Sequence, residues 1–162
     1  MVLVLFAIAA FLSCNALYLW AYHDVSSLKP WVLGTNYEAA DVKYKVDEVK
    51  QAEGKIIIRG WALVPGEPIS QDTYDHDSRW NNRIVMRDNR SGQYYEMPTQ
   101  KERRTDLTDY FNNLDGGSIR YDSGGFYSSA IFDGDLSNYT FFLLYRSNGH
   151  NALIELGQLG IS

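Results

Sequence analysis

The stretch Lys55–Val64, KIIIRGWALV, carries the clearest strand signal in the chain. It opens with three β-branched isoleucines and closes on bulky apolar residues, which favour a pleated, half-buried surface. Gly60 interrupts the run, and a glycine inside a strand indicates a bulge or the close approach of another backbone. The turn residues Pro65–Pro68, PGEP, end it. We therefore expect a central strand over residues 55–64.

Strand-like runs recur along the rest of the chain and are separated by turn residues. They cover residues 42–50, 83–88, 93–97, 123–132, 138–146 and 152–161. In the first run, Val42, Tyr44, Val46 and then Val49 are apolar, with charged residues between them. The turn Asp88–Gly92, DNRSG, joins the second and third runs and predicts a hairpin. Residues 101–113 indicate a charged connection with a short helical turn.

This pattern predicts an antiparallel β-sandwich of seven or eight strands, of the immunoglobulin-like or jelly-roll type, with a barrel as the second choice. No long segment after the N-terminus shows helical periodicity. We expect three regions in the chain: a hydrophobic helix over residues 1–22, a linker over residues 23–41 and the β-sandwich domain over residues 42–162.

The first 22 residues, MVLVLFAIAAFLSCNALYLWAY, form an apolar segment with no charged side chain. As a helix this segment measures roughly 33 Å, enough for a bilayer core of roughly 30 Å. Tyr18, Trp20 and Tyr22 gather at its C-terminal end, as aromatic side chains do at a membrane interface. We expect an uncleaved membrane anchor that forms one transmembrane helix.

Two other interpretations of this segment stay open. A cleaved signal peptide, including a lipoprotein with its lipid on Cys14, fits the length, although the apolar run continues past that cysteine and no basic residue precedes it. A helix buried in the domain is the third interpretation, but so long an apolar helix is difficult to bury in so small a protein. The direction of insertion stays open, because basic residues that would fix it are missing from the segment.

Charge and cysteine content exclude several classes of protein. The 15 basic and 20 acidic residues give a net charge of -5, which argues against a nucleic-acid partner, because phosphate binding needs a basic face. Cys14 is the one cysteine, so neither an intramolecular disulfide nor a cysteine-based zinc site can form. A domain of roughly 140 residues buries a sufficient core without such links. We expect no cofactor.

The polar loop Gln71–Asn82, QDTYDHDSRWNN, has the strongest functional character. Its candidate ligand-binding residues are Asp72, Tyr74, Asp75, Asp77, Arg79 and Trp80. Clustered carboxylates on a loop bind hard cations such as calcium, so the three aspartates are candidate metal ligands, although the glycine and final glutamate of an EF-hand loop are missing. The flat faces of Tyr74 and Trp80 suit a sugar instead. A solvated loop without a ligand is the third interpretation.

The sequence contains no known catalytic motif. G-x-S-x-G, the P-loop, H-E-x-x-H and G-x-G-x-x-G are all missing. His23, His76 and His150 are far apart and fall in linker or turn positions. We therefore predict no catalytic residue and no enzymatic activity. A hydrolase built on two facing carboxylates stays an alternative, because the chain has 20 acidic residues from which such a pair could come.

Four short motifs occur in a fixed order along the chain. They are Gly60-Trp61-Ala62 after three isoleucines, Arg104–Thr108 before Tyr110-Phe111, Tyr121–Phe126, and Tyr139–Phe142. This order resembles the small β-sandwich accessory domains of bacterial cell-surface polysaccharide and teichoic-acid-type glycosyltransferases, and their stand-alone membrane-anchored relatives. The resemblance covers residues 42–161. It implies a surface-associated context and brings no catalytic residue with it.

Six residues of these motifs have structural roles in our interpretation: Gly60, Trp61, Arg104, Asp106, Gly124 and Phe126. We expect Trp61 to be a core anchor for which Gly60 leaves room, and Arg104 to pair with Asp106 and fix a connection. The Gly124-Gly125 step would let the chain bend into the strand that contains Phe126.

Two functional hypotheses follow from the sequence. The first is a non-catalytic, membrane-anchored module outside the cytoplasm, on a bacterial cell surface, which binds carbohydrate or assists surface-polysaccharide assembly. The alternative is a protein-interaction subunit of a membrane complex that uses both the helix and the sandwich as contacts. In that case Ser13, Asn15 and the small residues of the apolar segment would contact a partner helix.

Overall fold

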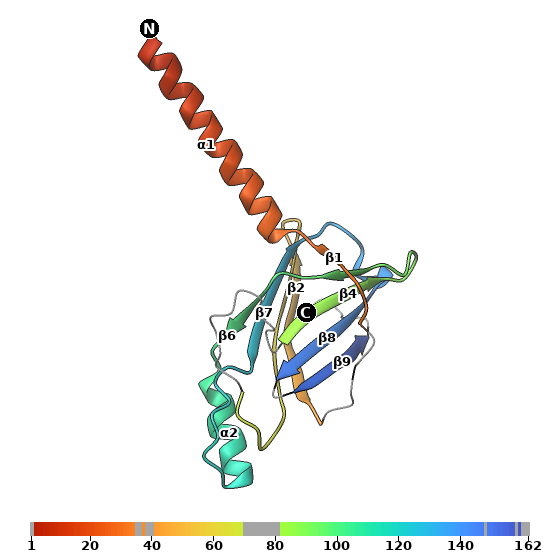
Figure 1. Cartoon of the computed structure of the whole chain (residues 1–162). Coiled ribbons are helices and arrows are strands. Elements are labelled where there is room, and N and C mark those ends of the chain that lie inside the picture. The colour runs from red at the N-terminus through yellow and green to blue at the C-terminus, as the bar shows by residue number, and fades with distance from the viewer. Residues whose placement is uncertain are drawn as a thin grey trace.

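Two antiparallel sheets face each other in a computed structural model of the chain, which describes residues 2–34, 37, 41–69, 82–147, 149–157 and 159 (Figure 1). The five-stranded sheet has the order β1 (Lys29–Trp31), β5 (Tyr94–Glu96), β4 (Asn82–Asp88), β8 (Tyr139–Ser147) and β9 (His150–Gly157). The four-stranded sheet has the order β2 (Lys43–Ala52), β3 (Lys55–Leu63), β7 (Gly125–Ile131) and β6 (Thr99–Glu102). The predicted β-sandwich is thus confirmed.

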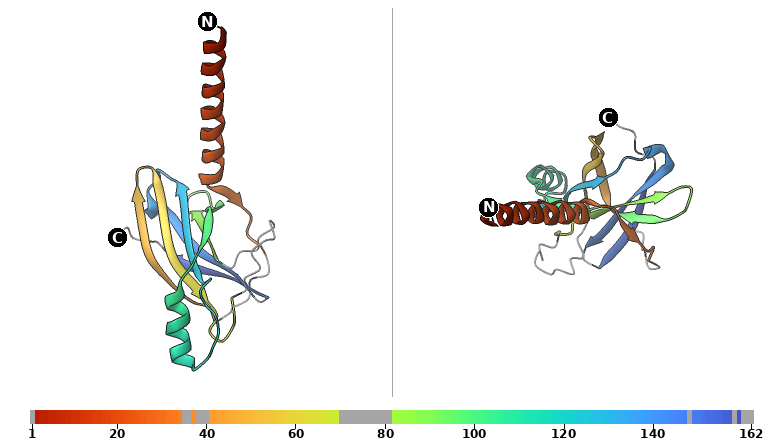
Figure 2. Two further views of the ribbon diagram at one scale, coloured as in Figure 1. Left: turned by 90° about the vertical axis from the view of Figure 1, so that its left-hand side faces the viewer. Right: turned by 90° about the horizontal axis from the view of Figure 1, so that it is seen from above.

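Three helical elements accompany the sheets within the described residues. Helix α1 (Val2–Ser26) leaves one end of the sandwich, and helix α2 (Thr105–Asp115) lies at the other end, as the left view of Figure 2 shows. The short 3-10 helix η1 (Leu136–Asn138) precedes β8. The two ends of the domain therefore have different surroundings, and the candidate site lies at the end with α2.

The main core lies between the two sheets. Strand β3 alternates along its length, with Ile56, Ile58 and Ala62 fully buried between the sheets. Ile84 of β4 and Phe141 of β8 meet them from the five-stranded sheet and are also fully buried. Period-two burial is the pattern expected of a sandwich strand, which explains why these strands could be read from the sequence.

Strand β2, at an edge of the four-stranded sheet, contains a bulge. Val46 pairs with Gly60 and Glu48 pairs with Arg59, which leaves Asp47 as the extra residue between them. The sequence carries a trace of this bulge, because its apolar residues keep to alternate positions up to 46 and resume at 49. An extra residue at 47 returns the later positions to the buried face.

Gly60 lies where two other segments leave no space for a side chain. A Cβ atom there would lie 2.2 Å from the carbonyl oxygen of Lys45 and 2.9 Å from Cζ of Phe126. The close approach predicted for this glycine is confirmed. It is the backbone of β2 that approaches, next to the bulge.

Two strands and one helix go beyond the sequence expectations. β1 lies within the stretch expected to be a linker, and β6 overlaps the start of the charged connection expected over residues 101–113; the described residues therefore contain nine strands. β1 consists of Lys29, Pro30 and Trp31. The indole of Trp31 packs edge-on against the ring of Tyr94, with ring centres 6.0 Å apart. Helix α2 is longer than the short turn expected, with 11 residues.

Helix α1 projects away from the sandwich (Figures 1 and 2). Its apolar side chains are exposed, among them Phe11 at 69% and Leu17 at 66%. The helix meets the domain at its C-terminal end, where the ammonium group of Lys55 lies 5.1 Å from the ring centre of Tyr22. The transmembrane helix expected over residues 1–22 is not supported, because no helix in the part of the chain that the structure describes is long and apolar enough to cross a membrane.

The Gly60→Ala substitution tests the constraint at the bulge. The new methyl group must displace the backbone of β2 or the ring of Phe126, and overpacking of this kind costs about 1–3 kcal/mol. We expect the free energy of unfolding in urea to fall by that amount. Gly117→Ala is the matched control, because its Cβ would lie 3.7 Å from Asn112 and meet no closer atom. Equal stability of the two variants would contradict the role of Gly60.

Candidate functional site

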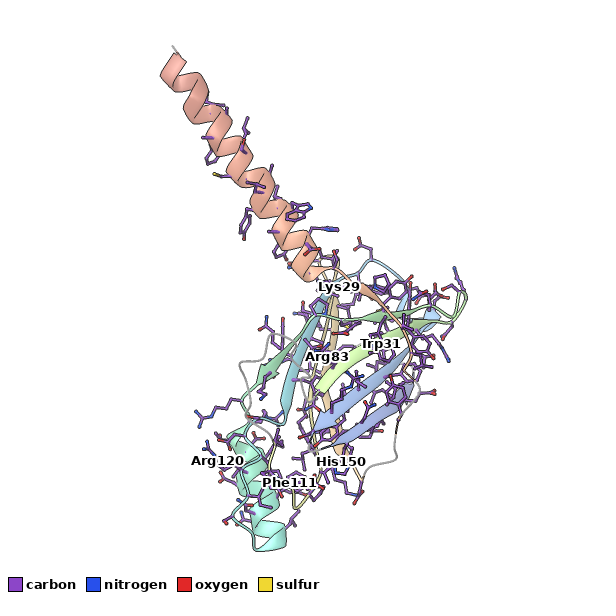
Figure 3. The ribbon with its side chains drawn as sticks, viewed as in Figure 1. Lys29, Trp31, Arg83, Phe111, Arg120 and His150 are labelled. Carbon is purple, nitrogen blue, oxygen red and sulfur yellow. The ribbon has the colours of Figure 1, made fainter. Side chains whose placement is uncertain are left out.

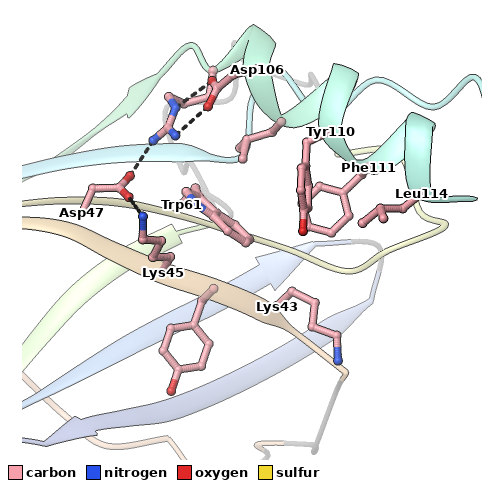
Figure 4. Close-up of a pocket in the computed structure, with 11 residues that line it drawn as sticks. Lys43, Lys45, Asp47, Trp61, Asp106, Tyr110, Phe111 and Leu114 are labelled. Carbon is pink, nitrogen blue, oxygen red and sulfur yellow. Dashed lines mark hydrogen bonds and ion pairs between the residues drawn. The ribbon is translucent and has the colours of Figure 1, made fainter.

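A groove of about 780 Å³ lies between helix α2 and the strands β2 and β3 (Figure 4). Phe111, at its helical wall, and Lys29, next to α1, lie at opposite ends of the domain (Figure 3). Eleven residues line the groove: Lys43, Tyr44, Lys45, Asp47, Trp61, Arg104, Asp106, Leu107, Tyr110, Phe111 and Leu114. Six of them are apolar or aromatic.

Helix α2 forms one wall of the groove. It has a negative charge in its first turn, at Asp106, where the helix dipole favours it. At its C-terminal end Gly116 adopts the left-handed conformation, with φ of 65°, and its N–H donates to the carbonyl oxygen of Asn112. Arg104 occupies the N-cap position, and its side chain does not cap the helix. The start of α2 therefore depends on tertiary contacts.

Side chains on the loop-facing side of α2 attach the helix to the segment that follows it. The hydroxyl of Thr108 donates to the carboxylate of Asp122 and accepts from the N–H of Tyr121 at 2.8 Å. The amide side chain of Asn112 donates to the carbonyl oxygen of Ile119 at 2.9 Å and accepts from its N–H at 3.1 Å. These four bonds fix the helix against the chain that leads into β7.

Aromatic rings form the apolar end of the groove. Phe111 is 6% exposed and packs edge-on against Trp61, with ring centres 5.7 Å apart. Trp61 is half-buried on the outer face of the sheet, so it anchors a second cluster beneath α2 rather than the core between the sheets. Tyr110 and Leu114 lie beside this cluster and are 59% and 63% exposed. The groove thus offers uncovered apolar surface.

Four charged residues form the other end of the groove, which we call the ion-pair chain. Arg104 donates two hydrogen bonds to Asp106, at 2.9 and 2.7 Å, and a third to Asp47 at 2.7 Å. Lys45 lies 3.1 Å from the second oxygen of Asp47 (Figure 4). Arg104 therefore joins the bulge of β2 to the first turn of α2. The expected pairing of Arg104 with Asp106 is present, and Asp47 was not predicted as its second partner.

Hydrogen bonds within the ion-pair chain favour the charged forms of Asp47, Arg104 and Asp106. The hydrogen bond from Arg104 lowers the pKa of Asp106, although partial burial opposes the change. For Asp47, partial burial raises the pKa, but hydrogen bonds from Arg104 and Lys45 outweigh it and the pKa is lowered. The hydrogen bonds to the two aspartates likewise raise the pKa of Arg104. All of these groups are charged at neutral pH.

The two glycines that precede Phe126 leave room for this arrangement. A Cβ atom at Gly125 would lie 2.5 Å from the carbonyl oxygen of Glu102 and 2.6 Å from Cγ of Arg104. A Cβ atom at Gly124 would lie 3.0 Å from Ile69 and 3.3 Å from a methyl group of Leu107 beneath α2. We expected a bend at these positions; the structure shows that they let the Arg104 side chain and the helix approach.

The loop residues predicted as a ligand site lie outside the described residues. They are Asp72, Tyr74, Asp75, Asp77, Arg79 and Trp80. The sugar site and the calcium site predicted there stay predictions. Among the residues that are described, no cluster of three or more His, Cys, Asp or Glu side chains is suited to hold a metal.

Sequence reasoning missed most of the groove. Of the six motif residues, Trp61, Arg104 and Asp106 line it, while Phe126 is buried in the main core. The signal for the remaining wall was present in the spacing of apolar residues at 107, 110, 111 and 114, which is helical.

Comparisons with protein-family models, with curated proteins and with solved structures found no match to this chain. The resemblance to glycosyltransferase accessory domains therefore stays a prediction from short motifs.

Arg104→Gln tests whether the ion-pair chain holds α2. The substitution removes three charge-assisted hydrogen bonds, and we expect the free energy of local opening of α2 to fall by about 1 kcal/mol. Hydrogen exchange of the α2 amides measures this. Arg120→Gln is the control, because Arg120 is 64% exposed and makes one contact of 3.4 Å with Asp122. Similar exchange in both variants would show that Arg104 does not hold the helix.

The stability of the domain should also depend on these aspartates at acid pH. Folding lowers the pKa values of Asp47 and Asp106. Their contribution to the free energy of unfolding is therefore complete above the ordinary aspartate pKa of about 3.9. It is lost as the pH falls through the lower pKa values of the folded state. We expect the free energy of unfolding to fall less steeply below pH 4 in Arg104→Gln than in the wild type. Parallel pH profiles of the two proteins would rule out this linkage.

Proposed function

We propose that this chain is a non-catalytic binding module, attached to a membrane through α1, that holds a protein partner in the groove between α2 and β2. The observation that carries the proposal is the uncovered apolar wall of the groove, where Tyr110 and Leu114 are 59% and 63% exposed. Exposed apolar side chains gathered beside a groove with a polar rim are typical of interaction sites.

The features of α1 support the proposed attachment. Residues 1–22 contain no charged side chain, and the polar side chains of Ser13 and Asn15 bond to the helix itself. The hydroxyl of Ser13 donates to the carbonyl oxygen of Ala9 at 2.9 Å, and the amide of Asn15 donates to that of Phe11 at 2.8 Å. A helix that satisfies its polar groups internally suits a lipid environment. The aromatic residues near its end would lie at the interface.

The groove would be held away from the membrane surface. Lys55 contacts Tyr22 at the end of α1, and Trp61 lines the groove six residues further along β3. At about 3.3 Å per residue this separates the groove from the helix by roughly 20 Å along the strand. A partner protein would therefore have access to the groove without contact with the bilayer.

The chemistry of the groove favours a protein over a sugar. Hydroxyl groups of a sugar need available polar partners, but Asp47, Arg104 and Asp106 already bond to one another. Leu107 and Leu114 offer surfaces suited to apolar side chains. Carbohydrate is the second candidate ligand, because four aromatic side chains also line the groove: Tyr44, Trp61, Tyr110 and Phe111. A role in surface-polysaccharide assembly outside the cytoplasm is supported by the family resemblance alone.

Tyr110→Ala and Leu114→Ala test the proposed function. The full chain in lipid nanodiscs is screened against a library of displayed twelve-residue peptides and against a glycan array. We expect peptides selected by the wild type to bind both variants at least about tenfold more weakly, as for central interface residues. Asn113→Ala, on the same helix and exposed but outside the groove, should bind as the wild type does.

The glycan array decides between the two candidate ligands. If the library yields no binding peptide and the same two substitutions weaken binding to a glycan, the ligand of the groove is a carbohydrate rather than a protein. Peptide binding that is equal in the wild type and both groove variants would place the interaction elsewhere and contradict the proposed site.

A further inference from the structure

We propose that the partner segment is extended and adds to β2 as a fifth strand of the four-stranded sheet. This inference rests on the proposed function, because it states how the groove would hold a protein segment. A chain that joins a sheet edge gains affinity from main-chain hydrogen bonds and specificity from its alternate side chains.

β2 presents an open edge beside the groove. Among the described residues, β3 is the one strand hydrogen-bonded to β2. The part of β2 that lines the groove includes Lys43, Tyr44 and Lys45. The Tyr44 residue is 42% exposed, and the lysine side chains at 43 and 45 are 53% and 66% exposed. Unpaired N–H and C=O groups of an edge strand are a template for another chain.

The backbone of Tyr44 faces away from β3. Its paired residue Ala62 donates its N–H to the carbonyl oxygen of Gly124 at 2.9 Å, and the carbonyl of Ala62 accepts from Nδ2 of Asn82 at 3.1 Å. The backbone groups of Ala62 thus turn away from β2, which makes this a non-hydrogen-bonded pair of the antiparallel ladder. The N–H and C=O of Tyr44 therefore point to the open edge, whereas the carbonyl oxygen of Lys45 lies against β3.

The residues around this edge define the chemistry of the segment. The ion-pair chain contains two cations and two anions, and Lys43, the remaining cation among the lining residues, pairs with Asp41 outside the groove at 2.7 Å. Its own partner, Asp41, has a side chain that is 78% exposed, and a partner's carboxylate can replace so weak a surface pair. An acidic residue opposite Lys43 and a β-branched residue opposite Tyr44 are favourable cross-strand pairs. A large apolar residue opposite position 45 would face the groove.

An antiparallel segment with an apolar, a β-branched and an acidic residue in succession meets these requirements. The domain's paired strands are antiparallel throughout the described residues, which favours that direction. Such a segment would place its middle residue opposite Tyr44. The two residues would exchange both N–H···O hydrogen bonds, as a hydrogen-bonded pair does.

The test uses the peptide acetyl-Ser-Thr-Thr-Leu-Val-Glu-Thr-Ser-amide with a fluorescent label, titrated with the full chain in nanodiscs. One derivative is N-methylated at Val, whose N–H would donate to the carbonyl of Tyr44. The matched derivative is N-methylated at Glu, whose N–H would point away from β2. We expect the first to bind at least about tenfold more weakly than the parent and the second to bind within about twofold of it.

The same titrations with Leu114→Ala separate this inference from the proposed function. If both N-methylated peptides bind equally and Leu114→Ala weakens them, strand addition is wrong and the groove stands as a protein site. Failure of the parent peptide to bind, or binding that Leu114→Ala leaves unchanged, overturns the inference for this segment chemistry. The screen of the displayed peptide library then tests separately whether the groove binds a protein segment, because that screen assumes no strand pairing.

Discussion

One extra residue in an edge strand, Asp47, is the constraint on which the candidate site depends. The bulge at this position forms opposite Gly60, where no side chain fits beneath the approaching backbone of β2. The carboxylate of Asp47 accepts a hydrogen bond from Arg104, which also binds Asp106 in the first turn of α2. The edge of the four-stranded sheet is thereby connected to a helix that follows a strand at its opposite edge.

This connection accounts for the shape of the groove. Leu107 and Phe111 of α2 are buried against the sheet, whereas Tyr110 and Leu114 on the neighbouring side of the helix stay uncovered. The ion-pair chain closes one end of the space between helix and strand, and the aromatic cluster around Trp61 forms its floor. The opposite end of the sandwich meets α1 (Figure 1), so the proposed attachment and the proposed binding groove lie at separate ends of the β-domain.

β3 could be predicted from the sequence because its burial alternates, and the hairpin of β4 and β5 could be predicted from the turn Asp88–Gly92 that joins them. β1 and β6 could not, because the sequences Lys29–Trp31 and Thr99–Glu102 have no such alternation and become strands through their neighbours. Helix α2 ends at Gly116 in the left-handed conformation, but its N-cap residue has no capping side-chain hydrogen bond, so its start depends on tertiary contacts. The groove combines positions 43–47, 61 and 104–114, and no local pattern indicates that a bulge brings them together.

A double-mutant cycle between Asp47→Asn and Arg104→Gln measures the central interaction most directly. The free energy of unfolding of the wild type, both single variants and the double variant gives their coupling energy. We expect a favourable coupling of about 0.5–1 kcal/mol, because the two groups form a partly buried, charge-assisted hydrogen bond. Additive effects, with no coupling beyond experimental error, would contradict the claim that the bulge holds the helix.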